Sequence, residues 1–289
     1  LQNSSNTDIA FSLIGLAPYI TAFFDALNKI DDVEIGRKFE FGSVFKTNMV
    51  VQHGKDFAVH GFGRANEAVT VEFLGETIST TADANGRFEV VFPASIMLPN
   101  TAGKILKATG EDGRVAEVYA VLIGDVYMVM GQQALLNNAP TDLTFTKSAN
   151  VRIYTAESVL SGSPQSVTLN SGWNRTNTAS YIYSNSILSF ISNKIYEQNN
   201  GVPVGFIVVA YGTSTPLEAY ASAQALPEMY IDMKEGYHAH SIYDTYINPL
   251  LGTNLSGIIM MHGGGIVTDA QRYVDIMQSI QEDMQDKFG

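Results

Sequence analysis

Three short runs of apolar residues constrain the fold of this chain more than any other sequence feature. They cover residues 121–130, 205–209 and 257–260. Strands that are buried on both faces have this composition, because helices cover both faces of a parallel sheet. The sequence therefore predicts a doubly wound parallel sheet in an α/β domain over residues 124–289. Helical patterns separate or follow the runs, at Ser184–Gln198, Leu217–Ala225 and Ala270–Lys287, and a further strand is expected at Asn150–Tyr154.

The preceding part of the chain, residues 41–123, has a different pattern. Short segments such as Ala68–Leu74 and Arg87–Phe92 alternate apolar and polar residues, and glycine or Asn-Gly turns separate them. Alternation with a period of two is typical of antiparallel strands that bury one face, and Asn-Gly favours a tight hairpin. We therefore expect a small antiparallel β-sandwich domain at residues 41–123.

The N-terminal segment, residues 1–40, contains the nearly uninterrupted apolar stretch Ile9–Phe24. Its sixteen residues are fewer than the roughly 20 that a membrane-spanning helix needs, and Pro18 interrupts it. We expect an apolar helix that joins copies of the chain into a homo-oligomer, with packing on its own domain as the alternative. No membrane contact is expected.

The composition excludes several classes of function. A formal net charge of -12 opposes binding to a nucleic-acid backbone. Cysteine is absent, which excludes disulfides, thiolate catalysis and zinc–thiolate sites. The low lysine and arginine content, with many threonine, asparagine, serine and tyrosine residues, favours an extracellular or cell-surface location.

Residues 124–135 read Gly-Asp-Val-Tyr-Met-Val-Met-Gly-Gln-Gln-Ala-Leu. This block resembles the G-D-V-W-x-x-x-G-Q-S-N-M motif of the sialate O-acetylesterase branch of the SGNH hydrolases. Other blocks that resemble this family lie at residues 45–52, 82–88, 201–220, 242–251 and 257–265, so that the resemblance covers residues 41–289. It implies a flavodoxin-like (SGNH) sheet behind a small β-sandwich, and it implies that the usual C-terminal segment, with its D-x-x-H motif, is lacking here.

The family's chemistry is acyl transfer, in which a serine attacks an acetyl carbonyl and a histidine accepts the proton. The resemblance places Gln133 where the family has its serine, and an amide is not a nucleophile. In the later block, Q-G-E-S-N is replaced by residues 262–266, His-Gly-Gly-Gly-Ile, so that Gly264 stands in place of the acid. We therefore expect degenerate active-site motifs and a pseudoenzyme.

Ligands of doubly wound sheets bind at the carboxyl ends of the strands. Ser214 and His262 are the remaining candidates for a catalytic role, as nucleophile and base. His238 and His240 lack a third ligand, so we expect no metal, and the glycine run lacks a phosphate-loop pattern, so we expect no cofactor. The binding residues expected at these strand ends are Gln132, Gln133, Tyr211, Gly212, Thr213, His262 and Gly263.

Three functions remain open at this point. The first is a catalytically inactive esterase-fold protein outside the cell that acts as a structural, self-assembling component. The second is a carbohydrate-binding component that uses the vacated pocket, with tyrosines as sugar platforms. The alternative is an active carbohydrate O-acetyl esterase with a non-standard nucleophile such as Ser214.

Overall fold

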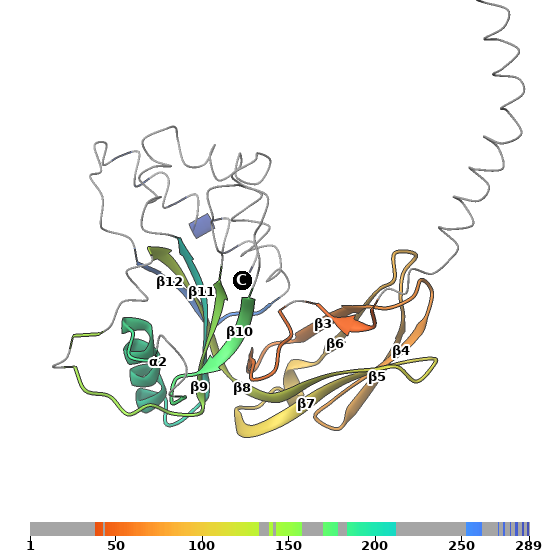
Figure 1. Cartoon of the computed structure of the whole chain (residues 1–289), viewed down its shortest axis with the longest axis horizontal. Coiled ribbons are helices and arrows are strands. Elements are labelled where there is room, and N and C mark those ends of the chain that lie inside the picture. Colours follow the sequence, from red (N-terminus) through yellow and green to blue (C-terminus); the bar gives the residue numbers. More distant parts are fainter. Residues whose placement is uncertain are drawn as a thin grey trace, which may run out of the picture.

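The computed structural model describes residues 38–42, 44–132, 139–140, 143–157, 170–178, 184–211 and 253–261, and single positions between 271 and 288. The predicted N-terminal helix and the predicted helix at 217–225 lie outside the described residues. Figure 1 shows the described elements in two groups that share one long strand. The elements are β1 (Glu40–Phe41), β2 (Val50–Gln52), β3 (Phe57–Phe62), β4 (Ala68–Phe73), β5 (Glu76–Thr81), β6 (Arg87–Phe92), the 3-10 turn η1 (Ala94–Ile96), β7 (Asn100–Gly110), β8 (Val115–Gln132), β9 (Val151–Glu157), β10 (Asn170–Arg175), α2 (Ile187–Gln198), β11 (Val204–Tyr211) and β12 (Gly257–Met261).

The first group consists of two antiparallel layers. One is the three-stranded sheet β1-β3-β6, and the other contains β5, β4, β7 and the first half of β8. Buried and exposed side chains alternate strictly along β6, as the sequence pattern predicts. Between the layers, the Phe73 ring lies 5.5 Å from Phe57 and 5.7 Å from Phe92, measured between ring centroids. These aromatic contacts form much of the core of the antiparallel part.

Strand β8 is 18 residues long and belongs to both groups. Its first half pairs antiparallel with β7, up to Ile123. From Asp125 onward it pairs parallel with β11. The sequence pattern predicts a strand over residues 125–130, which is only the later part of β8. The predicted domain limit between residues 123 and 124 therefore falls inside one continuous strand.

The second group is a mixed sheet with the order β10-β9-β11-β8, and β12 pairs with the other edge of β8. Strands β9, β11, β8 and β12 are parallel to their neighbours, whereas β10 is antiparallel to β9. Strand β12 has the predicted limits, and β9 and β11 begin or end within a few residues of the predicted ones. The chain is thus a sheet-rich α/β protein, and α2 is the one helix whose limits the described residues give.

Helix α2 covers one face of this sheet. Ser186 caps its N-terminus, because its side chain accepts a hydrogen bond from the Ser189 N–H at 3.2 Å. Leu188 of the helix packs against Val129, Phe206 and neighbouring apolar side chains of β8, β9 and β11. The predicted helix at 184–198 is confirmed, except that its first residues form a turn and the N-terminal cap and are not helical.

The opposite face of the sheet packs against the antiparallel part. Trp173 of β10 and Ile207 of β11 share one core with Val50 of β2. A Cβ atom on Gly205 would lie 2.8 Å from Val50 Cβ and 3.1 Å from Trp173 Cζ3, so glycine permits this close approach. Phe288 is buried in the same core, and its backbone is helical, as are the other described positions of the predicted C-terminal helix.

Within the described part of the chain, no helix has both the length and the apolar character needed to span a membrane.

Candidate functional site

The carboxyl ends of three parallel strands meet at one edge of the sheet. Tyr211, the last residue of β11, is the register partner of Gln132, the last residue of β8. Met261, which ends β12, is the register partner of Gly131 on the other side of β8. In Figure 1 the arrowheads of β8 and β11 lie side by side at this edge. The structure therefore brings together the chain segments that the sequence analysis selected.

The described residues include only part of the predicted site. The backbones of Gln132 and Tyr211 are adjacent, as expected for strand ends. Position 262 follows the last residue of β12 directly. The remaining predicted site residues lie outside the described residues: Gln133, Gly212, Thr213, Ser214, His262, Gly263 and Gly264, together with His238 and His240.

A polar cluster occupies the opposite, amino-terminal end of the same strands. Asp125 Oδ1 accepts a hydrogen bond from Ser256 Oγ at 2.9 Å and lies 3.0 Å from His53 Nε2. Its other oxygen, Oδ2, accepts from Asn199 Nδ2 at 2.9 Å. The Asp125 carboxylate thus connects β8 with three other elements. Its partners are the residue after β2, the residue before β12 and the residue that caps the C-terminus of α2. No local sequence pattern reveals this cluster, since its members are far apart in the chain.

Two more side chains complete the cluster. Gln52 Oε1 accepts a hydrogen bond from the Val126 N–H at 2.8 Å and lies 2.9 Å from Ser256 Oγ, whose single proton it shares with Asp125. Burial, and then the nearby Asp125 carboxylate, raise the pKa of Tyr127, while hydrogen bonds from Asn199 and Ser256 act in the opposite direction. The phenol of Tyr127 therefore stays protonated at neutral pH.

The order of contacts in this cluster differs from that of a catalytic triad. In a triad the imidazole lies between the hydroxyl and the carboxylate, so that it can take the hydroxyl proton. Here the Asp125 carboxylate lies between Ser256 and His53. Among the described residues, the cluster is thus a structural connection between strands and not an arrangement that activates Ser256.

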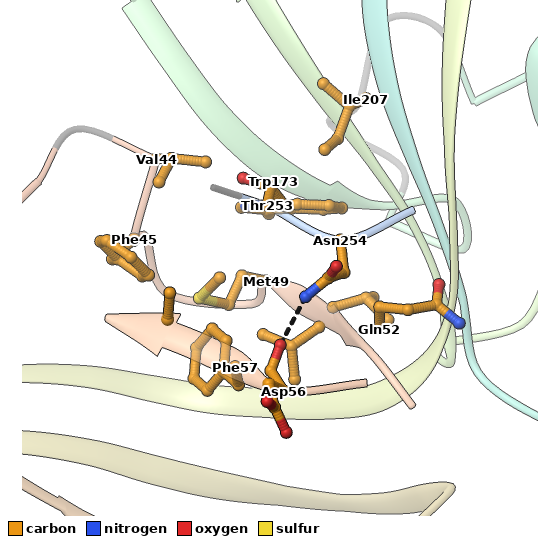
Figure 2. A pocket seen from close by; sticks show the side chains of 13 residues that line it. Val44, Phe45, Met49, Gln52, Asp56, Phe57, Trp173, Ile207, Thr253 and Asn254 are labelled. Atoms are coloured by element: carbon orange, nitrogen blue, oxygen red, sulfur yellow. Dashed lines mark hydrogen bonds between the residues drawn. The ribbon is translucent and has the colours of Figure 1, made fainter. Parts of the chain in front are cut away.

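A small cavity lies at the joint between the two parts of the chain (Figure 2). Its volume of about 20 Å³ accommodates one water molecule and is far smaller than a sugar ring. The Trp173 indole lines it, and its buried Nε1 has no hydrogen-bond partner among the described residues. Asn254 Nδ2 donates to the Asp56 carbonyl across the same joint. The cavity belongs to the packing of the joint and is not a candidate carbohydrate site.

No group of three or more histidine, cysteine, aspartate or glutamate side chains suited to a metal ion is found in the described part of the chain.

Comparison with known proteins shows the fold and not the family. No protein-family model matches the chain, and no curated protein sequence does. Among solved structures, the chain is similar to a carbohydrate acetylesterase from Xanthomonas citri, with a TM-score of 0.67 and 21% sequence identity. The alignment covers 86% of this chain and 57% of that protein, so the chain spans little more than half of its length. The chain therefore has an esterase-like fold.

Two further similar structures match a smaller part of the chain. One is a bacterial immunoglobulin-like domain from the M. primoryensis ice-binding adhesin, with 22% identity, a TM-score of 0.21, and coverage of 30% of this chain and 95% of that domain. The other is a fibronectin(III)-like module of Clostridium thermocellum CbhA, with 13% identity, a TM-score of 0.22, and coverage of 30% and 95%.

Proposed function

We propose that this chain is a catalytically inactive, sialate O-acetylesterase-like protein with an SGNH-type fold. In this proposal it acts outside the cell as a structural, self-assembling or carbohydrate-binding component. The observation that carries the proposal is the identity of the residue that follows β8. The strand ends at Gln132, and the next residue is Gln133, where the resemblance places a nucleophilic serine. The esterase-like fold supports the comparison of these positions.

The order of the parallel strands supports placing the site at the end of β8. The chain enters this sheet through β8, places β9 and then β11 on one side, with β11 between β9 and β8, and later adds β12 on the other side. Later strands thus lie on both sides of β8, and ligands of doubly wound sheets bind at such a reversal of strand order, outside the carboxyl ends of the strands. Gln132 and Gln133 are the residues that the chain offers there.

The chemistry of the residues at this position argues against acyl transfer. A glutamine amide is neither basic nor nucleophilic, so Gln133 cannot form an acyl-enzyme. Gly264 provides no acid in the later block. Glutamine and tyrosine side chains can nevertheless donate hydrogen bonds to sugar hydroxyls and pack on sugar faces. The proposed glycan-binding residues are Gln132, Gln133, Tyr211, Gly212, Thr213, His262 and Gly263.

Hydrolysis assays test the proposed inactivity. The purified chain is expected to hydrolyse p-nitrophenyl acetate and O-acetylated sugars no faster than a protein-free blank. A carbohydrate-binding role predicts saturable binding of a deacetylated glycan by an isolated subunit, and this binding should weaken in Tyr211→Ala. Turnover that a single substitution abolishes would contradict the proposal.

The similarity to an acetylesterase favours one alternative, which is a carbohydrate O-acetyl esterase with a different nucleophile. Ser214 is the candidate, because it lies three residues after the end of β11, and His262, the residue after β12, is the candidate base. Hydrolysis that is lost in Ser214→Ala and kept in Ser256→Ala would support this alternative. The second variant is the control, since Ser256 lies at the opposite end of the sheet.

Self-assembly is the proposed role of the apolar segment Ile9–Phe24. Deleting residues 1–30 is expected to convert an oligomer into a monomer in multi-angle light scattering. An unchanged oligomeric state after the deletion would remove this part of the proposal and leave the proposed inactivity untouched.

A further inference from the structure

Two arginines face each other on the neighbouring strands β9 and β10. Arg152 and Arg175 are register partners in this antiparallel pair, so their side chains lie on the same face of the sheet. They sit near the start of β9, since Arg152 is also the register partner of Gly205 near the start of β11. The pair is therefore at the opposite end of the sheet from Gln132.

Neutral oxygen atoms accept hydrogen bonds from both guanidinium groups, and two of them belong to the antiparallel part. Arg152 Nη1 donates to the Ala120 carbonyl, and Arg152 Nε donates to the Ala149 carbonyl at 3.3 Å. Arg175 donates to Asn48 Oδ1 through Nε at 3.2 Å and through Nη2 at 3.0 Å. Both arginines thus connect the parallel sheet to residues next to β2 and within β8.

The two residues of the antiparallel part that supply these acceptors both have strained backbone conformations. Asn48 has a φ of 72° and Ala120 a φ of 56°, which is the left-handed region that non-glycine residues seldom adopt. Such conformations persist only where the surrounding structure holds them, and they gather at ligand sites. Here they aim two acceptor oxygens at the arginine pair.

The charge of the pair is not balanced by an acid. Arg152 is 3% exposed, and no carboxylate forms an ion pair with either arginine in the part of the chain that the structure describes. Burial, and then the neighbouring Arg175, lower the pKa of Arg152 to about 10. Like charges placed directly opposite each other in a sheet are unfavourable. This arrangement is unusual in a chain whose formal net charge is -12.

Arg175 is exposed and keeps unused donors. A guanidinium group has five N–H donors in a planar fork that fits carboxylate and phosphate oxygens. Two of its nitrogens, Nε and Nη2, donate to Asn48 Oδ1, and Nη1 makes no hydrogen bond within the described residues. Arg175 can therefore bind an anion directly. The buried positive charge of Arg152, on the neighbouring strand, adds electrostatic attraction.

We propose that Arg152 and Arg175 form an oxyanion-binding site, whose ligand carries a carboxylate or phosphate group. The anion hydrogen-bonds to Arg175 Nη1 and Nη2 and offsets the repulsion between the two guanidinium groups. The site lies on the joint between the two parts of the chain and is independent of the strand-end site. It would give the protein an affinity for acidic glycans or phosphorylated ligands whether or not the strand-end site binds a sugar.

The fluorescence of Trp173 provides a measure of anion binding at this site. It is the single tryptophan of the chain, it lies two residues before Arg175 in β10, and its ring packs on Tyr154 at 5.5 Å between centroids. Titration with inorganic phosphate and, separately, with glucuronate is followed by Trp173 fluorescence and by isothermal titration calorimetry. We expect saturable binding of at least one probe, and an affinity at least about tenfold lower in Arg175→Gln.

Arg87→Gln is the matched control, because Arg87 is an exposed arginine that pairs with Glu89 on the same strand. It should bind both probes as the unchanged chain does. Binding of phosphate alone identifies a phosphoryl ligand, and binding of glucuronate alone identifies a carboxylate ligand. If neither probe binds saturably, or if Arg175→Gln and Arg87→Gln weaken binding equally, the proposal is wrong.

Discussion

Asp125 Oδ1 lies 3.0 Å from His53 Nε2, which joins the first residue of the parallel half of β8 to the residue that follows β2. The same carboxylate also binds Ser256 and Asn199. It is only 13% exposed, so water competes weakly for its oxygens. The amino ends of the strands are thus fixed by one side chain, and this fixes the register with which Gln132, Tyr211 and Met261 reach the opposite edge.

Replacing Asp125 with asparagine should therefore destabilise the fold markedly. The asparagine keeps the shape but directs a donor NH2 group at other donors. The expected loss is about 2–3 kcal/mol in the free energy of unfolding, measured by urea denaturation. Glu72→Gln is the control, because it removes an exposed ion pair with Lys107 and should cost at most about 1 kcal/mol. Equal effects of the two substitutions would show that the cluster does not hold the strands.

Gly124 marks the point where β8 changes from antiparallel pairing with β7 to parallel pairing with β11. A Cβ atom there would collide with the Pro203 carbonyl oxygen, a backbone atom that cannot rotate away. Gly124→Ala should therefore cost about 3 kcal/mol in the free energy of unfolding. Gly257→Ala, at the first residue of β12, is the control, because its new Cβ would lie 3.8 Å from Tyr127, which is an ordinary van der Waals contact. That control should stay within about 0.5 kcal/mol of the unchanged chain by thermal denaturation.

His60 makes the stability of the antiparallel part depend on pH. Burial, and then the Arg87 charge, lower the pKa of His60 below its ordinary value of 6.5, while Glu89 acts in the opposite direction. The unfolded chain therefore binds a proton more readily than the folded chain, so stability falls as the pH drops below 6.5. The fall continues until the pH reaches the lower pKa of the folded state.

Substitution of this histidine isolates its contribution. His60→Gln should remove part of the pH dependence below 6.5 and leave the behaviour above it unchanged. Urea denaturation of both chains at several pH values measures the difference between them. Parallel stability curves for the two chains over the acidic range would show that His60 does not contribute.

Much of the fold follows from local sequence patterns. The apolar run at 257–260 gives β12, and the strict alternation at 87–92 gives β6. Ser186 and the apolar pattern after it give α2. These elements are predictable because each is determined by its own burial pattern or cap.

Contacts between distant residues were not predictable. Strand β10 was missed, since its sequence Asn-Ser-Gly-Trp-Asn-Arg has little alternation and it forms only through pairing with β9. His53 and Asp125 are 72 positions apart, and no local pattern joins them. Arg152 lies between the apolar residues Val151 and Ile153, and its hydrogen bond to the distant Ala120 carbonyl could not be read from this pattern. In the candidate site, strand geometry could be predicted at Gln132 and Tyr211, and the residues that follow them lie outside the described residues.

The central claim is that no side chain of the strand-end site forms a covalent bond with an acyl or phosphonyl group. Intact mass spectrometry after incubation with a fluorophosphonate probe tests this claim directly. We predict an unchanged protein mass under conditions in which a serine esterase is fully labelled. A probe adduct that peptide mapping assigns to Ser214, or to another residue after β8, β11 or β12, would contradict it.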